Sequence, residues 1–205
     1  MNGLRNRTRA LRHGEVRRPR RTQRGQAMIE FSMFAVFLFT LAAGVADVGS
    51  LLDDHENVVF AARQGARTGS VLGPQTAADC AIVGAVHASV LNQSDLSLQQ
   101  IIIYKSDANG LPTVVGGTVQ EDVYPGYVDC VNGAIVDGRA APPQPTVAPT
   151  VNNWPPSSRS NTPFTEDSLG VELDYTFQWR FNLFGTGSLS GVDRSVFPIN
   201  VTTSG

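Results

Sequence analysis

An uncharged apolar run from Phe31 to Ala46, sixteen residues long, constrains the fold of this chain more than any other feature. Counted back to Ala27, the segment reaches 20 residues and contains a single charged residue, Glu30. A helix of that length spans roughly 30 Å, about the thickness of the hydrocarbon core of a bilayer. The segment therefore predicts a membrane-spanning helix whose apolar part ends before Asp47.

The charges on the two sides of this segment differ in sign. Residues 1–25 contain nine arginines and one glutamate, a net charge of +8, whereas the rest of the chain carries a net charge of −10. The positive-inside rule then places the N-terminus in the cytoplasm and the residues beyond about 47 outside. A basic arm can also bind nucleic acid, but this one lacks interleaved aromatic residues and adjoins a membrane helix, so we expect no nucleic-acid partner.

Three kinds of processing fit such an N-terminus. The helix is a plain single-pass anchor, or a secretory signal cleaved after Ala46, or a prepilin-type segment that loses only its basic leader. Glu30 favours the third, because a carboxylate in a membrane helix costs a few kcal/mol and neither a signal nor a simple anchor gains from it. A subunit whose helix leaves the bilayer to pack against other copies does gain from it.

The sequence GQAMIEF, from Gly25 to Phe31, resembles the prepilin cleavage site, with the cut between Gly25 and Gln26 and with Glu30 as fifth residue of the mature chain. Further along, GVADVG and AARQGAR resemble the TadE-like proteins, which are minor pilins or pseudopilins of the tight-adherence (Tad/Flp) pilus and secretion systems. Val36 and Gln64 depart from the family pattern, which often has a proline and an acidic residue there. The motif residues are Gly44, Asp47, Gly49, Ala61, Ala62, Arg63, Gly65, Ala66 and Arg67.

The resemblance implies a structural subunit that is cleaved by a prepilin peptidase and assembles with other pilin subunits and the pilus assembly platform, with roles in adhesion or secretion. After cleavage, the new α-amino group of Gln26 lies one helical turn from Glu30 and neutralises it, within one subunit or between neighbours. For the small residues of AARQGAR we prefer core packing over a partner site. For Arg63 and Arg67 we expect a solvated helix face.

The remaining pattern predicts an α+β protein: a leader (1–25), a transmembrane and stalk helix (26–70) and an extracytoplasmic head (71–205) with one or two helices and an antiparallel sheet. We expect the first helix to stop at Gly69 or Gly73-Pro74. The other predicted elements are a helix at 76–91, strands at 99–104, 170–184 and 195–203, and a possible paired strand at 113–119. Pro198 indicates that the last strand lies at an edge. Seven prolines in 137–163 predict a long loop without helix or sheet.

The chain contains two cysteines, Cys80 and Cys130, and because both lie in the exported part we predict a disulfide between them. We find no catalytic motif, no metal-ligand spacing and no cofactor fingerprint, and we therefore expect a protein that is not an enzyme. His55 is expected to be a packed residue, and the acidic residues Asp53, Asp54 and Glu56 a solvated turn. The alternative function is a membrane-anchored or secreted extracytoplasmic binding domain unrelated to pili.

Overall fold

The computed structural model describes residues 23–90, 93–126, 128, 130–131, 135–136, 139–140, 144–145, 147–181 and 187–200. Most of the predicted basic leader lies outside these residues; its last three positions already belong to a helix. The chain divides into two compact units, residues 1–42 and 43–205. We call the first the N-terminal unit and the second the head.

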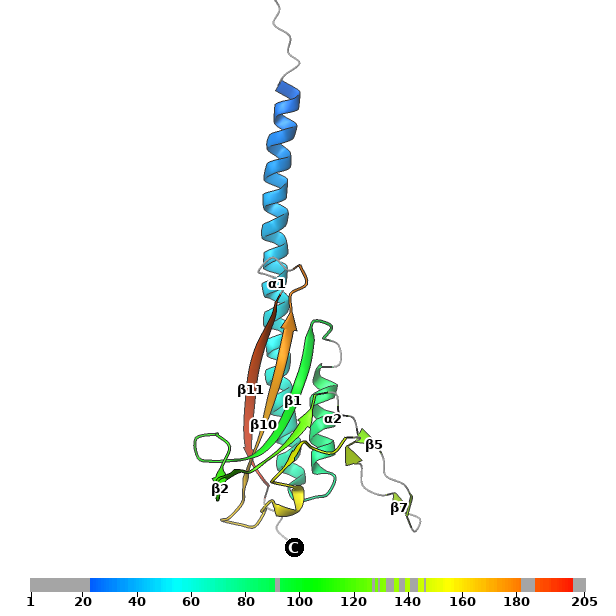
Figure 1. Ribbon diagram of the computed structural model, residues 1–205, viewed down its shortest axis with the longest axis vertical. Helices are drawn as coiled ribbons and strands as arrows, with labels where there is room; N and C mark the ends of the chain where they lie inside the picture. Colours follow the sequence, from blue (N-terminus) through cyan, green and yellow to red (C-terminus); the bar gives the residue numbers. More distant parts are fainter. Residues whose placement is uncertain are drawn as a thin grey trace, which may run out of the picture. The chain divides into compact units, whose positions relative to one another are not determined.

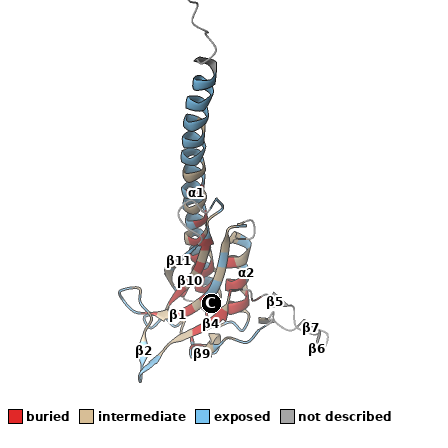
Figure 2. Ribbon diagram, turned by 45° about the horizontal axis from the view of Figure 1, so that its top comes forward, coloured by how far each residue is buried: buried red, intermediate tan, exposed pale blue. Residues whose placement is uncertain are grey.

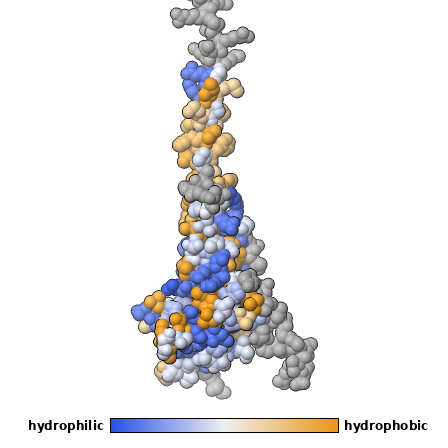
Figure 3. Space-filling model, viewed as in Figure 1, coloured by the Kyte–Doolittle hydropathy of each residue, from blue (hydrophilic) through white to orange (hydrophobic). Residues whose placement is uncertain are grey.

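Helix α1 (Gln23–Leu72) is a single helix of 50 residues, as the apolar run and the amphipathic stripe after it predicted. Its side chains in the N-terminal unit are exposed, with Met28 and Phe39 at 76% and 75% of their full accessibility. Apolar side chains cover most of the visible surface of this unit, apart from hydrophilic residues at its upper end (Figure 3). Among the described residues, α1 is the one helix long and apolar enough to cross a membrane.

Helix α1 ends at Leu72, directly before Gly73, and continues through Gly69. Gly73 has a φ of +51°, a left-handed conformation that glycine adopts without strain, and its N–H donates to Gly69 O at 2.8 Å. Pro74 follows, which lacks the N–H needed to continue a helix. Gly69 lies inside the helix, where its missing side chain makes room for Ile82 and Leu169.

The head contains a five-stranded antiparallel sheet in the order β11-β10-β1-β4-β9, with a second helix (Figure 1). Its α+β class is therefore as predicted. The 11-residue strands β10 and β11 form a hairpin, and β11 is an edge strand as Pro198 indicated. The elements are α2 (Ala78–Val90), β1 (Leu96–Ser106), β4 (Glu121–Pro125), β9 (Val151–Asn152), β10 (Ser168–Gln178) and β11 (Ser188–Pro198).

Strands β2 (Val114–Val115) and β3 (Thr118–Val119) pair with each other across Gly116-Gly117, so the possible strand at 113–119 is a hairpin outside the main sheet. Four short elements lie within 137–163, β9 among them, and contradict the prediction that this stretch holds neither helix nor sheet. They belong to a segment that packs on the head at two buried residues, Trp154 and Arg159. The elements in or next to this segment are β5 (Cys130–Val131), β6 (Ile135–Val136), β7 (Arg139–Ala140), β8 (Gln144–Pro145) and the 3₁₀ helix η1 (Pro156–Ser158).

The core of the head lies between one face of the sheet and the two helices α1 and α2 (Figure 2). Strand β10 alternates as its sequence predicted, with Leu173, Tyr175 and Phe177 buried and the intervening polar residues on the other face. Helix α2 contributes Ile82, Val83 and Val86. This packing holds the helix motifs and the polar cluster described below in fixed positions.

Candidate functional site

The predicted processing segment, Gly25 to Phe31, is helical and exposed throughout. Gln26 and Glu30 lie on one face of α1, and Gln26 Nε2 donates a hydrogen bond to Glu30 Oε1 at 2.9 Å. The spacing of four residues therefore brings position 26 and the carboxylate together, as the sequence indicated. Both residues lie at the start of the exposed apolar surface of α1, in the N-terminal unit.

Asp47, from the motif GVADVG, is completely buried in the head. Its Oδ1 accepts hydrogen bonds from the backbone N–H groups of Arg180 and Phe181, each at 3.1 Å. A carboxylate is a strong acceptor for backbone donors, so Asp47 fixes the segment after β10 to helix α1. Of its two motif neighbours, Gly44 is partly buried and Gly49 is exposed. The resemblance pointed to Asp47, but the sequence contained no sign of its partners.

The small residues of AARQGAR, namely Ala61, Ala62, Gly65 and Ala66, are buried in the core of the head. A Cβ atom at Gly65 would lie 2.9 Å from Val86 Cγ2, so glycine permits the close approach of α1 and α2. In this structure the small residues of the motif pack in the core of the head, between α1 and α2. Arg63 and Arg67 are exposed on the opposite face of the helix, as expected.

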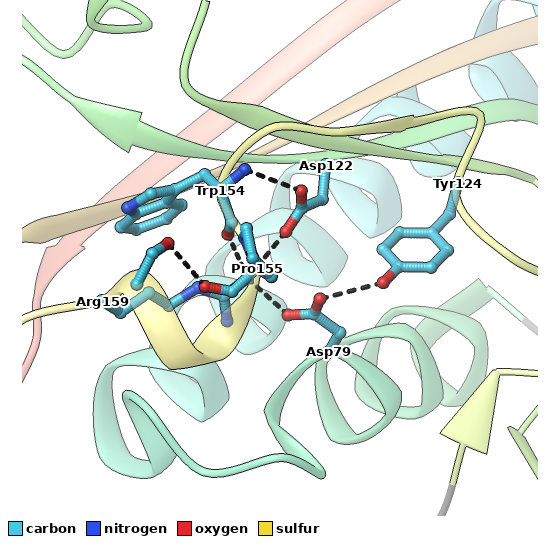
Figure 4. A network of polar contacts seen from close by, with 7 residues as sticks. Asp79, Asp122, Tyr124, Trp154, Pro155 and Arg159 are labelled. Atoms are coloured by element: carbon cyan, nitrogen blue, oxygen red, sulfur yellow. Dashed lines mark hydrogen bonds and ion pairs between the residues drawn. The ribbon is translucent and has the colours of Figure 1, made fainter.

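A buried polar cluster, which sequence reasoning missed, joins α2, β4 and the proline-rich segment (Figure 4). Arg159 has a fully buried side chain, and its Nη2 lies 2.6 Å from Asp79 Oδ1 and 3.3 Å from Asp122 Oδ2. Trp154 N donates to Asp122 Oδ1 at 3.0 Å, and the Arg159 guanidinium lies 4.7 Å from the centre of the Trp154 ring. Tyr124 OH donates to Asp79 Oδ2 at 2.9 Å. We call these five residues the Arg159 cluster.

The electrostatics of the Arg159 cluster reflect its burial. The pKa of Asp122 is raised to about 6, mainly by burial and also by the negative charge of Asp79, against the opposing effects of the Trp154 N–H and Arg159. Burial, and then the negative charge of Asp79, also raise the pKa of Tyr124, so this phenol stays protonated and donates to Asp79. Two carboxylates face one guanidinium, so the cluster carries one net negative charge when both are ionised.

A tryptophan and an arginine within NWPPSSR offered one indication of this cluster, because large aromatic residues in polar loops usually find a buried site. Asp79 and Asp122 gave no such indication. Nothing in the sequence around either aspartate distinguishes it from an acid on the surface. The fold alone brings both carboxylates to Arg159.

The other predicted residues divide between the head core and its surface. Cys80 is buried in the first turn of α2 and disulfide-bonded, whereas the side chain of Cys130 lies outside the described residues, so the pairing of the two stays a prediction. The solvated-turn interpretation is wrong for Asp54, which is buried because α1 turns it toward the head. His55 is half-exposed, and its Nδ1 lies 3.0 Å from Tyr175 Oη and 3.2 Å from Asp193 Oδ2.

These observations define an α+β head that follows an apolar helix long enough to span a membrane. In a comparison with known families, a family model described as TadE-like protein matches residues 25–67, so this part of the chain is similar to the TadE-like proteins. The match supports a pilin-like protein associated with the Tad pilus. No curated protein and no solved structure matches the chain.

Proposed function

We propose that this chain is a minor pilin, or pseudopilin, of a Tad-type pilus or secretion apparatus. It is made as a precursor with a cytoplasmic N-terminus, cleaved after Gly25 by a prepilin peptidase, and held in the membrane by α1 with its head outside. It then assembles with other pilin subunits on the assembly platform and contributes to filament assembly or surface adhesion. Its role is structural and not enzymatic.

The observation that carries this proposal is the position of Glu30 on α1. The side chains around it are apolar and exposed, with Ile29 at 63% and Phe31 at 72% accessibility, so they need a lipid or protein environment. Glu30 shares a helix face with residue 26, whose α-amino group is positive after cleavage. Pairing of that amine with Glu30 neutralises the carboxylate when the helix is buried in a filament.

The TadE-like match supports the same proposal, because it begins at Gly25, the residue before the proposed cut. It also covers Asp47 and the AARQGAR motif, which lie in the head. The family segment therefore includes both the proposed processing signal and the residues that join α1 to the head.

The test compares Glu30→Ala with Glu56→Ala, a matched loss of an exposed acid further along the same helix. Both variants, with the wild type, are expressed in cells with and without the prepilin peptidase, and filaments are sheared from the surface. We expect both variants to reach the membrane, and Glu30→Ala to be lost from the filament fraction while Glu56→Ala is retained. Normal incorporation of Glu30→Ala, or equal loss of both variants, contradicts the proposed role of Glu30.

A further inference from the structure

Gln26, the residue that the proposed cut exposes, has a side chain that can react with its own backbone. Cleavage after Gly25 turns the backbone nitrogen of Gln26 into a free α-amine. An N-terminal glutamine can then cyclise: the α-nitrogen forms a bond to Cδ of the same residue, the Cδ–Nε2 bond breaks, and one proton of the neutral amine leaves with Nε2 as ammonia. The product is a neutral lactam, and the step needs no co-reactant.

Cyclisation would remove the charge that the proposed function pairs with Glu30. The side chain of Glu30 is the single charged side chain in residues 26–46, and the arginines of the leader are lost with the cut. With a lactam in place of the amine, this carboxylate would have no cation on its own helix segment. An unpaired carboxylate in apolar surroundings is strongly unfavourable. The mature helix therefore requires that Gln26 stays open.

One contact in the structure opposes this cyclisation. Gln26 Nε2 donates a hydrogen bond to Glu30 Oε1 at 2.9 Å, one helical turn along α1. Both side chains are exposed, so packing against other residues does little to hold the amide. Ring closure needs rotation of the side chain until Cδ reaches the α-nitrogen of the same residue. The hydrogen bond restricts that rotation, and it also holds the nitrogen that has to leave.

Glu30 also acts on the other reacting group, the α-amine of Gln26. A carboxylate one helical turn away favours the protonated form of an amine, which has no lone pair with which to attack Cδ. A carboxylate has two oxygens that accept hydrogen bonds. While Oε1 of Glu30 accepts from the side-chain amide, Oε2 can accept from the amine. The same carboxylate can therefore hold both ends of the reaction apart.

We propose that Gln26 is a cyclisation site of the mature chain and that Glu30 suppresses the reaction by holding the side-chain amide and keeping the α-amine protonated. This role exists only in a chain that is cut after Gly25, so it rests on the proposed function. Glu30 forms no bond in the reaction and acts as a positioning residue. It protects the charge of the new N-terminus while the subunit waits in the membrane, before any filament forms.

The first test uses mature chains made without the prepilin peptidase. A fusion protein in detergent micelles is cut by factor Xa directly before Gln26, which releases the chain from Gln26 to its C-terminus. The forms compared are the wild type, Glu30→Ala, Glu30→Gln and Glu56→Ala, the last being a matched loss of an exposed acid on the same helix. Each is incubated at physiological pH and temperature, and intact mass follows the loss of ammonia.

We expect Glu30→Ala to lose ammonia at least tenfold faster than the wild type, and Glu56→Ala to react at the wild-type rate. Glu30→Gln keeps an acceptor for the side-chain amide but has no charge, so its rate should lie between those of the wild type and Glu30→Ala. Adding Gln26→Ala to the Glu30→Ala chain should abolish the mass loss, which locates the reaction at residue 26.

Equal rates in the wild type and Glu30→Ala, including no reaction in either, overturn the proposal. Equal acceleration by Glu30→Ala and Glu56→Ala overturns it too. A Glu30→Gln rate equal to that of the wild type contradicts the part assigned to the charge, and a rate equal to that of Glu30→Ala contradicts the part assigned to the hydrogen bond.

The wild-type chain recovered from the membrane of producing cells separates this proposal from the proposed function. A chain that begins at Gln26 and retains its ammonia supports both. A chain that begins at Gln26 but has lost one molecule of ammonia contradicts the protective role of Glu30 and leaves the proposed cleavage intact. A different N-terminus contradicts the proposed cleavage, while the rates of the released chains still decide what Glu30 does to Gln26.

Discussion

Asp47, the residue at which the apolar run ends, accepts a hydrogen bond from the backbone N–H of Arg180 at 3.1 Å, across 133 positions of sequence. The same oxygen accepts a second bond from Phe181. One buried carboxylate therefore holds Arg180 and Phe181, which follow β10, against α1. This contact makes a residue of the family motif a structural tie within the head.

Replacement of Asp47 by alanine should destabilise the head. Two backbone donors lose their acceptor, and the loss of a charge-assisted bond to such donors costs about 1–3 kcal/mol. Asp47→Asn keeps one oxygen and should cost less. Chemical denaturation of the full chain in micelles measures the free energy of unfolding, and amide exchange at Arg180 and Phe181 reports the local effect.

The control for Asp47 is Asp53→Ala, because Asp53 is exposed and lies on the same helix. Its removal should change the free energy of unfolding by no more than about 0.5 kcal/mol. Equal effects of the two substitutions, or unchanged amide exchange at Arg180 in Asp47→Ala, would refute the structural role of Asp47.

Gly65 should not tolerate a side chain. Because its Cβ would lie 2.9 Å from Val86 Cγ2 and 3.4 Å from Val171 Cγ1, Gly65→Val should destabilise the head by about 1–3 kcal/mol through overpacking. Gly49→Ala is the matched control on the same helix, since a Cβ there has no neighbour within 4 Å. It should be neutral or should stabilise the chain by up to about 1 kcal/mol, the difference in helix propensity.

A double variant decides whether the contact of position 65 with Val86 causes the destabilisation expected for Gly65→Val. Val86→Ala should cost stability in the wild type but should recover part of the loss in Gly65→Val, because it opens the space that the new side chain needs. If the two substitutions are simply additive, the close approach of α1 to α2 at Gly65 is not the cause.

Arg159 should matter far more to stability than an exposed arginine of the same sheet region. Arg159→Gln leaves the buried carboxylates of Asp79 and Asp122 without their cation, a loss of about 3–5 kcal/mol. Arg194 pairs with Glu172 at 2.7 Å but its side chain is 42% exposed, so Arg194→Gln should cost at most about 1 kcal/mol. Thermal and chemical denaturation of both variants measure the difference, and similar losses would contradict the buried ion-pair account.

The pH dependence of stability should depend on Asp122. Its pKa is raised from 3.8 to about 6 by burial and by Asp79, against the opposing Arg159 and Trp154 N–H, so between these values the folded protein holds a proton that the unfolded chain has lost. Its contribution to stability is therefore fully present below 3.8 and is lost as pH rises through about 6. The free energy of unfolding of the wild type should fall relative to Asp122→Asn over this range.

Denaturation of the wild type and Asp122→Asn at several pH values measures this relative slope. Tryptophan fluorescence, measured in a Trp179→Phe background so that it reports on Trp154 alone, checks that the variant keeps the Arg159 cluster folded. Parallel stability curves for the two proteins would show that Asp122 keeps its ordinary pKa in the folded head.

The uncharged apolar run predicted the N-terminal part of α1. Periodicity predicted the rest of α1, α2 and β10, because each of these buries one regular face, and the α+β class followed from them. Periodicity was not enough for β4, whose sequence EDVYP contains two acids and a proline. Asp122 points toward the core in this strand because Arg159, 37 residues later, supplies its counter-charge. A pattern of apolar residues cannot reveal a buried charge whose partner comes from a distant loop.

The residues of the candidate site also fall into two groups, those that the sequence alone indicated and those that depend on the fold. Glu30 was conspicuous because a lone carboxylate in an apolar run is unfavourable by itself, whatever surrounds it. The role of Gly65 followed from the small residues around it. The partners of Asp47 and the members of the Arg159 cluster come from segments far apart in the sequence, and only the folded head brings them together.

The central claim is that the chain is processed as a prepilin, and the N-terminus of the mature protein tests it most directly. The chain is recovered from the membrane and from sheared filaments of the producing cells, and its intact mass and N-terminal sequence are determined. We predict that the mature chain begins at Gln26, with Glu30 as its fifth residue. A chain that begins at Asp47 would identify a conventional secretory signal, and a chain that keeps its basic leader would identify a plain membrane anchor; either result would contradict the claim.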